Sequence, residues 1–371
     1  MIKWRWRLFW VGISIGTSPG CSTSSGEELG QQLFERIEVT VGVRTSAILA
    51  AHLNSDEHLD LLVVGGDRVV SLQGRGDGRF DIVGSVPAGE HAVDLALADL
   101  DGDGLIDLAV ANHATDYVTL LSGVAGGGFE VRASSRLRVN VAPHPHAVRL
   151  SDIDGDGQAD LLVDDRAAEA IRLFKGVGQG RFAKAIQIPV GGDPYRGMTL
   201  TDVNGDGEID LVTPNPDHVA VLIGDGLGGF AQDTVLYPGF APFSVTAADF
   251  NGDGLTDLAA GSGEGAGALF IWHGSAAGVF QAAGDYELAV GPTKLAAADL
   301  TGDGRAEVIV TSYIGGEVAV LADGEEPILY RFESSGHPYG VATGDFDGDG
   351  QTDFAIANDG AEHITVFLSR F

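Results

Sequence analysis

The feature that most constrains the fold is an acidic nine-residue segment that recurs along the 371-residue chain. One complete copy reads Asp99-Leu-Asp101-Gly-Asp103-Gly-Leu105-Ile-Asp107. Copies begin at seven positions that lie 46 to 53 residues apart: His52, Asp99, Asp152, Asp202, Asp249, Asp299 and Asp345. A period of this length indicates the blades of a propeller rather than the smaller units of a solenoid.

The sequence around each acidic segment also repeats in a fixed order. In the second unit, apolar residues 92–98 lead into the acidic segment, residues 108–111 leave it, and residues 117–121 follow. A glycine-rich turn ending in phenylalanine, residues 123–129, then opens a fourth extended segment at 129–139. Short apolar segments joined by tight turns indicate antiparallel strands, and consecutive apolar residues, as at 161–163, indicate strands covered on both faces.

The two ends of the chain indicate how the repeat closes. Residues 363–369 correspond to the third strand of the last unit, which therefore lacks a fourth. An unassigned extended segment, residues 33–41, precedes the first unit and matches that missing strand. Pairing the two would remove the open edge. We therefore predict an all-β, seven-bladed propeller over residues 33–371, with four-stranded antiparallel blades and a ring closed by the N-terminal strand.

These units resemble the FG-GAP or VCBS repeats of integrin α-subunit propellers and of many secreted bacterial proteins. The resemblance covers residues 33–371 and rests on a motif that recurs at one period. The first unit departs from the motif, with His52, Ser55 and Glu57 in place of the usual loop residues. The sixth departs less, with Thr301 and Glu307.

The acidic loops predict calcium as a structural cofactor, with up to six sites. Calcium takes several oxygen ligands at about 2.3–2.6 Å, and alternating aspartates on a tight glycine turn can direct their carboxylates inward together. Without an ion these carboxylates would repel one another. At the Leu105 position the predicted ligand is the backbone carbonyl. The residues predicted to bind calcium are Asp99, Asp101, Asp103, Leu105, Asp107, Asp152, Asp154, Asp156, Gln158, Asp160, Asp202, Asn204, Asp206, Glu208, Asp210, Asp249, Asn251, Asp253, Leu255, Asp257, Asp299, Thr301, Asp303, Arg305, Glu307, Asp345, Asp347, Asp349, Gln351 and Asp353.

Three other interpretations of the loops compete with calcium binding. An EF-hand needs a bidentate Glu at position twelve and flanking helices, but that position is Val110 in one loop and Val163 in another, within strand-like sequence. Magnesium is less suited because it keeps its waters and demands octahedral geometry. The aspartates could instead serve only to hydrogen-bond the backbone of a turn, and for the degenerate loop at His52 we favour this alternative.

The charge of the chain restricts its partners. The formal net charge of −31 would repel nucleic acid and anionic lipid headgroups, so neither is predicted as a partner. Cations are favoured, and metal ions filling the loops would neutralise much of the excess charge.

The N-terminus predicts export and lipid anchoring. Residues 1–20 read as a basic start, a short apolar stretch and small residues, which is the order of a signal peptide. Cys21, the only cysteine, follows directly and resembles the acylated cysteine of bacterial lipoproteins, although Ser18 stands where leucine is usual. An ordinary cleaved signal peptide is the alternative. Residues 21–32 would form a flexible tether, and Ser22 favours the outer membrane, so the predicted location is the bacterial cell envelope.

A candidate ligand site lies where the innermost strands begin. The residues six positions before each loop should converge around one mouth of the central channel, on the face opposite the acidic loops. They are Ser46, Val93, His146, Arg196, Phe243, Thr293 and Tyr339. Of these, His146, Arg196, Phe243 and Tyr339 could bind a sugar or an acidic small molecule. The alternative is that they only fill and solvate the channel.

The sequence favours a non-enzymatic binding module, with a protein or polysaccharide as ligand. The runner-up is a carbohydrate-active lyase or hydrolase at the channel mouth, with His146 and Arg196 as its best candidate pair. A structural subunit of an envelope complex is a third possibility. The spacing of serine, cysteine, histidine and aspartate indicates no catalytic triad or dyad.

Overall fold

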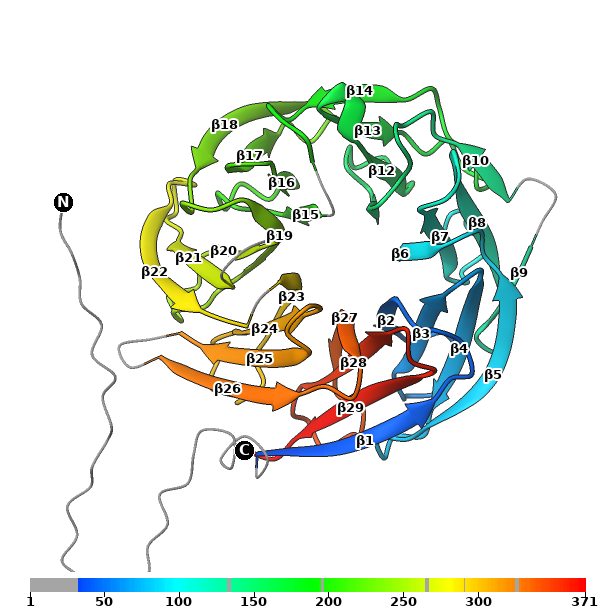
Figure 1. The fold of residues 1–371 in the computed structure, drawn as a ribbon. Helices are drawn as coiled ribbons and strands as arrows, with labels where there is room; N and C mark the ends of the chain where they lie inside the picture. The colour runs from blue at the N-terminus through cyan, green and yellow to red at the C-terminus, as the bar shows by residue number, and fades with distance from the viewer. Residues whose placement is uncertain (1–32, 132–134, 195–196, 264–266, 290, 324–326) are drawn as a thin grey trace, which may run out of the picture.

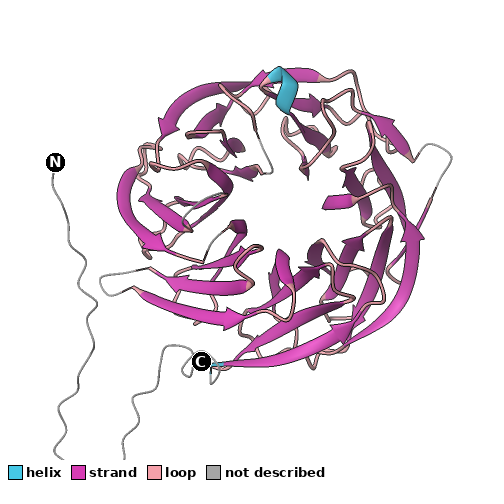
Figure 2. Ribbon diagram, viewed as in Figure 1, coloured by secondary structure: helices cyan, strands magenta, loops and turns pink. Residues whose placement is uncertain are grey.

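The computed structural model describes residues 33–131, 135–194, 197–263, 267–289, 291–323 and 327–371. The described residues form seven antiparallel sheets arranged as a ring (Figure 1). One short 3₁₀ helix, η1 (Arg166–Ala168), lies among strands and loops (Figure 2). The predicted all-β, seven-bladed propeller is confirmed.

Blades one to six each take their strands from one repeat, in order from the channel outward, and blade seven adds the N-terminal strand as its outer strand. The strands of blades one to three are β2 Ala47–Ala51, β3 Asp60–Gly65, β4 Arg68–Gly74, β5 Phe80–Pro87; β6 Ala92–Ala98, β7 Asp107–Asn112, β8 Tyr117–Val124, β9 Gly128–Glu130, β10 Arg136–Arg138; β11 Val148–Ser151, β12 Asp160–Asp165, β13 Ala170–Phe174 and β14 Ile186–Pro189.

Blades four to seven follow the same order. Their strands are β15 Thr199–Thr201, β16 Asp210–Pro214, β17 Val219–Gly224, β18 Phe230–Leu236; β19 Pro242–Ala248, β20 Asp257–Ser262, β21 Ala268–His273, β22 Gln281–Glu287; β23 Pro292–Ala298, β24 Glu307–Ser312, β25 Glu317–Ala322, β26 Ile328–Glu333; β27 His337–Gly344, β28 Asp353–Asp359, β29 His363–Ser369 and β1 Phe34–Thr40.

The second strand of each blade explains the runs of consecutive apolar residues. Every residue of β3, β7, β12, β20 and β24 is buried. Such a strand has a neighbouring strand on each side and a neighbouring blade on each face, so no position faces water. The seven hydrophobic clusters of the described residues each combine side chains from two adjacent blades. The core is therefore a set of blade interfaces that continues around the ring.

The ring closes as predicted. Strand β1 pairs antiparallel with β29, from Phe34 opposite Ser369 to Thr40 opposite His363, and becomes the outer strand of blade seven (Figure 1). The Phe34 ring is buried and makes edge-to-face contacts with Phe332 of blade six and with Phe354 and Phe371, at 5.2–5.4 Å between centroids. The N-terminal segment thus joins two blades as well as completing one.

The outer strand of blade two differs from the prediction of one extended segment over 129–139. Strand β9 ends at Glu130 and β10 begins at Arg136, and both pair with β8. Outer strands have one solvent-exposed edge, so their pairing is less constrained than that of buried strands.

Some sequence-based predictions fall outside the described residues. They are the signal peptide and tether at residues 1–32, Cys21 with its predicted lipid, and Arg196. Within the described residues, no helix has the length and apolar character needed to cross a membrane.

Candidate calcium loops and channel mouth

The acidic loops join the first and second strands of the blades, and their first aspartate organises the turn. In blade two, Asp99 accepts backbone N–H groups from Gly102 on Oδ1 at 2.7 Å and from Gly104 on Oδ2 at 2.9 Å. Both glycines have positive φ, +80° and +84°, which L-residues with a side chain rarely adopt. The same pair of bonds recurs at Asp202, Asp249, Asp299 and Asp345.

The ninth residue of each loop is a buried carboxylate that fastens the blade. Asp107 accepts the backbone N–H of Leu100 on Oδ2 and that of Gly123 on Oδ1, at 2.9 and 2.8 Å. Asp60, in the degenerate loop of blade one, makes the equivalent bonds to Leu53 and Gly74. Burial raises the pKa of both carboxyl groups. Burial also raises the pKa of Asp353 to about 6. The first blade therefore keeps the fastening carboxylate although its first and third loop positions are His52 and Asn54.

Three loops bring three carboxylates close enough to share one cation. In each set, one oxygen per residue lies within 4.8 Å of the others. The sets are Asp99, Asp101, Asp107; Asp152, Asp154, Asp160; and Asp345, Asp347, Asp353. In blades four, five and six the third loop position is Asn204, Asn251 or Thr301, which offers a neutral oxygen instead. These loops hold fewer charges, although amide and hydroxyl oxygens remain possible calcium ligands.

In the acidic loops of blades three and seven, a basic side chain already neutralises part of the carboxylate charge. Lys175 Nζ lies 2.8 Å from Asp154 Oδ2 in blade three. Arg370, next to the C-terminus, lies 2.8 Å from Asp347 and 3.4 Å from Asp349 in blade seven. A calcium ion in either loop would compete with a fixed positive charge.

The loop geometry fits both the calcium interpretation and the turn interpretation of the aspartates. Their carboxylates hydrogen-bond the backbone, as the turn alternative requires, and in three blades they also lie at distances suited to a shared cation. A carboxylate has about four acceptor sites, so one that accepts a backbone N–H can still bind a metal. The residues present therefore fit calcium.

At the opposite ends of the inner strands lies a cavity of about 680 Å³ at the mouth of the channel. Five of the seven positions predicted to converge there line it: Ser46, Val93, Phe243, Thr293 and Tyr339. Residues from the turns between second and third strands complete it, among them Gly66, His113, Gly263, Tyr313 and Asp359. Blades one, two, five, six and seven thus contribute to one pocket.

One side of the mouth is aromatic. The rings of Tyr313 and His337 stack with 4.8 Å between centroids, and Tyr339 meets Tyr313 edge-on at 6.1 Å. His337 Nδ1 also lies 2.9 Å from the backbone carbonyl of Tyr313. This wall combines apolar ring faces with polar edges, the surface that commonly lines small-molecule sites.

Charged side chains cross the channel between non-adjacent blades. Asp94 of blade two lies 2.9 Å from Arg149 of blade three and 3.8 Å from Lys294 of blade six. Its Oδ2 also accepts the backbone N–H of Val148. The channel interior is thus partly filled by an ion cluster, whose members are not among the seven residues predicted to converge at the mouth.

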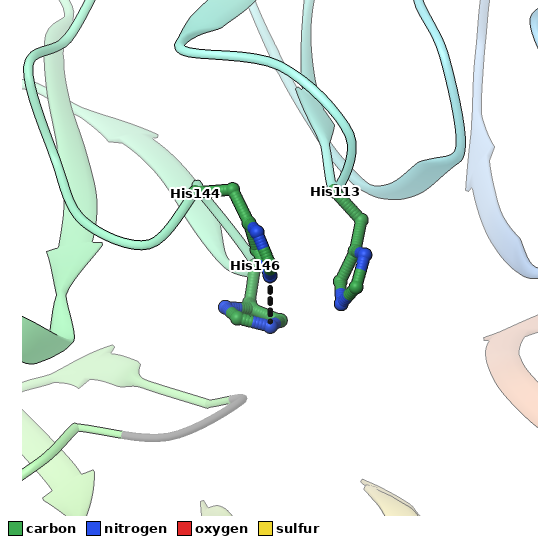
Figure 3. A group of neighbouring side chains, drawn as sticks. All are labelled: His113, His144 and His146. Carbon is green, nitrogen blue, oxygen red and sulfur yellow. Dashed lines mark hydrogen bonds between the residues drawn. The ribbon is translucent and has the colours of Figure 1, made fainter.

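His146 does not line the mouth cavity as predicted for its repeat position, because it is buried beside it. It lies next to His144 and His113, with 3.1 Å between the Nε2 atoms of His144 and His146 (Figure 3). Its Nδ1 lies 3.3 Å from Oδ2 of the buried Asp164. Sequence reasoning missed His113 and Asp164, although a signal existed: His113 lies fourteen residues after Asp99, as Tyr313 does after Asp299. Extending the repeat alignment to the turns after the second strands would have placed His113 and Tyr313 at the mouth.

Comparison with known families agrees with the repeat and the ring. The FG-GAP-like repeat model matches residues 52–110, 99–163, 152–213, 202–260 and 249–310, and the FG-GAP repeat model matches 337–364. The chain therefore belongs to the FG-GAP repeat proteins, within the class of seven-bladed β-propellers. No curated protein sequence matches it significantly.

Solved structures of similar fold include enzymes and a lectin. A streptogramin B lyase aligns with a TM-score of 0.61 at 13% identity, over 94% of this chain and 100% of that one. The periplasmic gluconolactonase of Pseudomonas aeruginosa gives 0.56 at 19%, over 76% and 82%. An Agrocybe aegerita lectin that recognises non-reducing terminal N-acetylglucosamine gives 0.53 at 17%, over 89% and 96%. At these identities the likeness shows the fold alone.

Proposed function

We propose that this protein is a non-enzymatic binding module of the bacterial cell envelope, with calcium as structural cofactor and a polysaccharide as ligand at the channel mouth. The observation that carries the proposal is the mouth cavity, built from repeat-equivalent residues of five blades. Its volume falls within the range of about 300–1,000 Å³ typical of small-molecule sites. A protein partner usually covers about 800 Å² of each surface, so a short stretch of glycan fits such a pocket better.

The chemistry of the lining supports a sugar. Tyr339, Tyr313 and Phe243 contribute aromatic side chains to the lining, and Ser46 and Thr293 contribute hydroxyl groups that also donate to backbone carbonyls. Carbohydrates carry apolar C–H faces and a periphery of hydroxyl groups, and such a ligand uses both kinds of contact. A lectin among proteins of the same fold is consistent with this proposal.

The envelope location is supported by the N-terminal sequence. A lipid on Cys21 would hold the propeller to the membrane through the tether, with no other membrane contact. Replacing Cys21 with Ser should block labelling by a radioactive fatty acid and release the protein from the membrane fraction. Unchanged labelling and fractionation would argue against the anchor.

Glycan binding can be tested with variants of the aromatic wall. The purified protein should retain specific envelope glycans on an array, and Tyr339→Ala and Phe243→Ala should each weaken that binding by about tenfold or more, as loss of a central aromatic contact does. Tyr237→Ala is the matched control, because Tyr237 is 66% exposed and lies outside the cavity. Equal binding by all three variants would rule out the mouth as the site.

A carbohydrate-active lyase or hydrolase is the second candidate. The buried His146 with Asp164 beside the mouth resembles a positioned general base, and two enzymes share the fold. Measuring turnover separately from binding decides between the candidates. Turnover that is lost in His146→Gln would favour the enzyme, and binding without any turnover would favour the module.

A further inference from the structure

Three histidines from two blades meet beside the mouth cavity. His113 lies in the turn between β7 and β8 of blade two, and His144 and His146 lie in the segment that enters β11 of blade three (Figure 3). One ring nitrogen of each lies within 4.8 Å of the others. Ring centroids are 3.8 Å apart for His113 and His144, and 4.8 Å apart for His113 and His146. From this geometry we propose that His113, His144 and His146 bind a divalent transition-metal ion such as Zn²⁺.

The distance between the two closest nitrogens suits a shared metal. Zinc–imidazole bonds are about 2.0–2.1 Å long, so two ligands on a tetrahedral ion lie about 3.4 Å apart. The Nε2 atoms of His144 and His146 face each other at 3.1 Å (Figure 3). If the ion is absent, one of these nitrogens must carry a proton and donate it to the other; a bound ion accepts both lone pairs.

Asp164 supplies the outer contact that a metal-binding histidine requires. Its Oδ1 accepts the backbone N–H groups of His146 and Ala147, at 2.7 and 2.8 Å. Its Oδ2 faces Nδ1 of His146 at 3.3 Å and, among the described residues, accepts no hydrogen bond. A carboxylate beside Nδ1 favours the tautomer with its proton there, which leaves the Nε2 lone pair for a metal.

The residue at position 164 also departs from the repeat pattern. Asp164 is fully buried, and the equivalent positions of other blades hold apolar or small residues such as Val64, Ala111 and Gly261. A carboxylate in such a position loses its contact with water, and the two backbone hydrogen bonds to Oδ1 offset only part of that loss. An imidazole bound to a cation carries positive charge toward Asp164 and compensates it. This departure from the repeat occurs beside the three histidines.

Hydrogen bonds and an ion pair anchor each histidine segment to its blade. The backbone N–H of His113 donates to the carbonyl of His91, and that of Val139 donates to the carbonyl of Asp116. The Asp165 carboxylate accepts the N–H of Ala142 and pairs with Arg172 at 2.6 Å. The site is therefore attached to strands of both blades and not to one mobile loop.

The metal would face the proposed ligand pocket. His113 lines the mouth cavity and a neighbouring polar pocket of about 530 Å³, which His144 also lines. With three protein ligands, the fourth position can hold water or an anionic group of a ligand, as in zinc sites with an open coordination position. The acidic loops lie at the opposite ends of the inner strands, so this site is separate from them.

The test measures Zn²⁺ and Co²⁺ binding to the purified protein in detergent, with calcium in excess to occupy the acidic loops. Wild type should bind one equivalent of Zn²⁺, and Co²⁺ should give the intense visible bands of tetrahedral coordination. His113→Ala and His144→Ala should abolish both signals. Asp164→Asn should weaken zinc binding by about 10- to 100-fold, as loss of outer-shell partners does.

His337→Ala is the matched control, because His337 is an exposed histidine on the aromatic side of the same mouth. It should bind both ions as wild type does. His113 is only partly buried in its turn, and His113→Gln keeps the side-chain volume, so loss of binding can be separated from loss of folding by circular dichroism. Absence of zinc binding by wild type, or unchanged binding in both folded His113 variants, would overturn the proposal.

Discussion

At the scale of single residues, the acidic loop divides its carboxylates between two tasks. The ninth carboxylate is buried in every blade, and in blades one and two it accepts two backbone N–H groups, although the first loop is degenerate. The third carboxylate, such as Asp101, is half-buried, accepts the backbone N–H of Asp103 and joins the set suited to a cation. The ninth position therefore fastens strands whether or not an ion is bound, whereas the third acts through the ion.

A pair of substitutions separates these tasks. Asp107→Ala leaves two buried N–H groups unsatisfied, so we expect it to lower the free energy of unfolding by about 2–4 kcal/mol even without calcium. Asp101→Ala should change the calcium-free protein by less than about 0.5 kcal/mol but should reduce the stabilisation that calcium adds. Urea unfolding with and without calcium measures both. Equal effects of the two substitutions in the absence of calcium would contradict this division.

Lys175 offers a second residue-scale prediction. Its ammonium group lies 2.8 Å from Asp154, where it competes with a cation in the blade-three loop. Lys175→Gln should strengthen calcium binding by roughly two- to fivefold at that loop, the range of a partly exposed ion pair. Isothermal titration calorimetry with calcium measures the change, and repeating it with Asp152→Ala added to Lys175→Gln assigns the change to this loop. A weaker or unchanged affinity would show that Lys175 does not compete.

At the scale of elements, β1 is the strand on which closure depends. Phe34→Ala removes a buried ring from the contact of blades six and seven, so we expect a loss of about 3–5 kcal/mol. Glu35→Ala, at an exposed position of the same strand, should cost less than about 1 kcal/mol although it removes an ion pair with Arg370. Amide exchange in β29 should accelerate in the first variant only. Unchanged exchange there would mean that closure does not rest on this strand.

Much of this element-level architecture could be predicted from the sequence, because the repeat fixes the equivalent positions in every blade. The period predicts the blades, the consecutive apolar residues predict the buried second strands, and the unpaired segment at 33–41 predicts closure. The split between β9 and β10 could not be predicted, since outer-strand pairing depends on weak edge contacts. His113 was missed because its ring contacts join adjacent blades, and such contacts appear only when turns from two repeats are superimposed. Asp164 was missed because it lies in a buried second strand, at a position where other blades hold apolar or small residues.

At the scale of the whole molecule, seven buried ninth-position carboxyl groups link stability to pH. Burial raises the pKa of Asp60, Asp107, Asp160, Asp210, Asp257, Glu307 and Asp353, the last to about 6. A carboxyl group whose pKa is higher in the folded than in the unfolded state stabilises the fold below its unfolded pKa, and this contribution is lost as pH rises through the folded pKa. The calcium-free protein should therefore lose stability between about pH 4 and pH 6.

Calcium should change this pH dependence, because it binds only ionised carboxylates. The difference in melting temperature between calcium-loaded and calcium-free protein should grow from pH 4 to pH 7. Differential scanning calorimetry across this range provides the check. A calcium-free protein that becomes more stable over the same interval would contradict the assignment of raised pKa values to the fastening carboxylates.

The measurement that tests the central claim most directly is thermal unfolding of the purified protein during calcium removal and return. Each site filled at 100 times its dissociation constant adds about 2.7 kcal/mol, so several loops acting together should move the melting temperature by many degrees. We predict a marked fall on full chelation and recovery when calcium, but not the same concentration of magnesium, is restored. A melting temperature that stays unchanged after complete metal removal would contradict the claim that these acidic loops bind calcium to hold the propeller together.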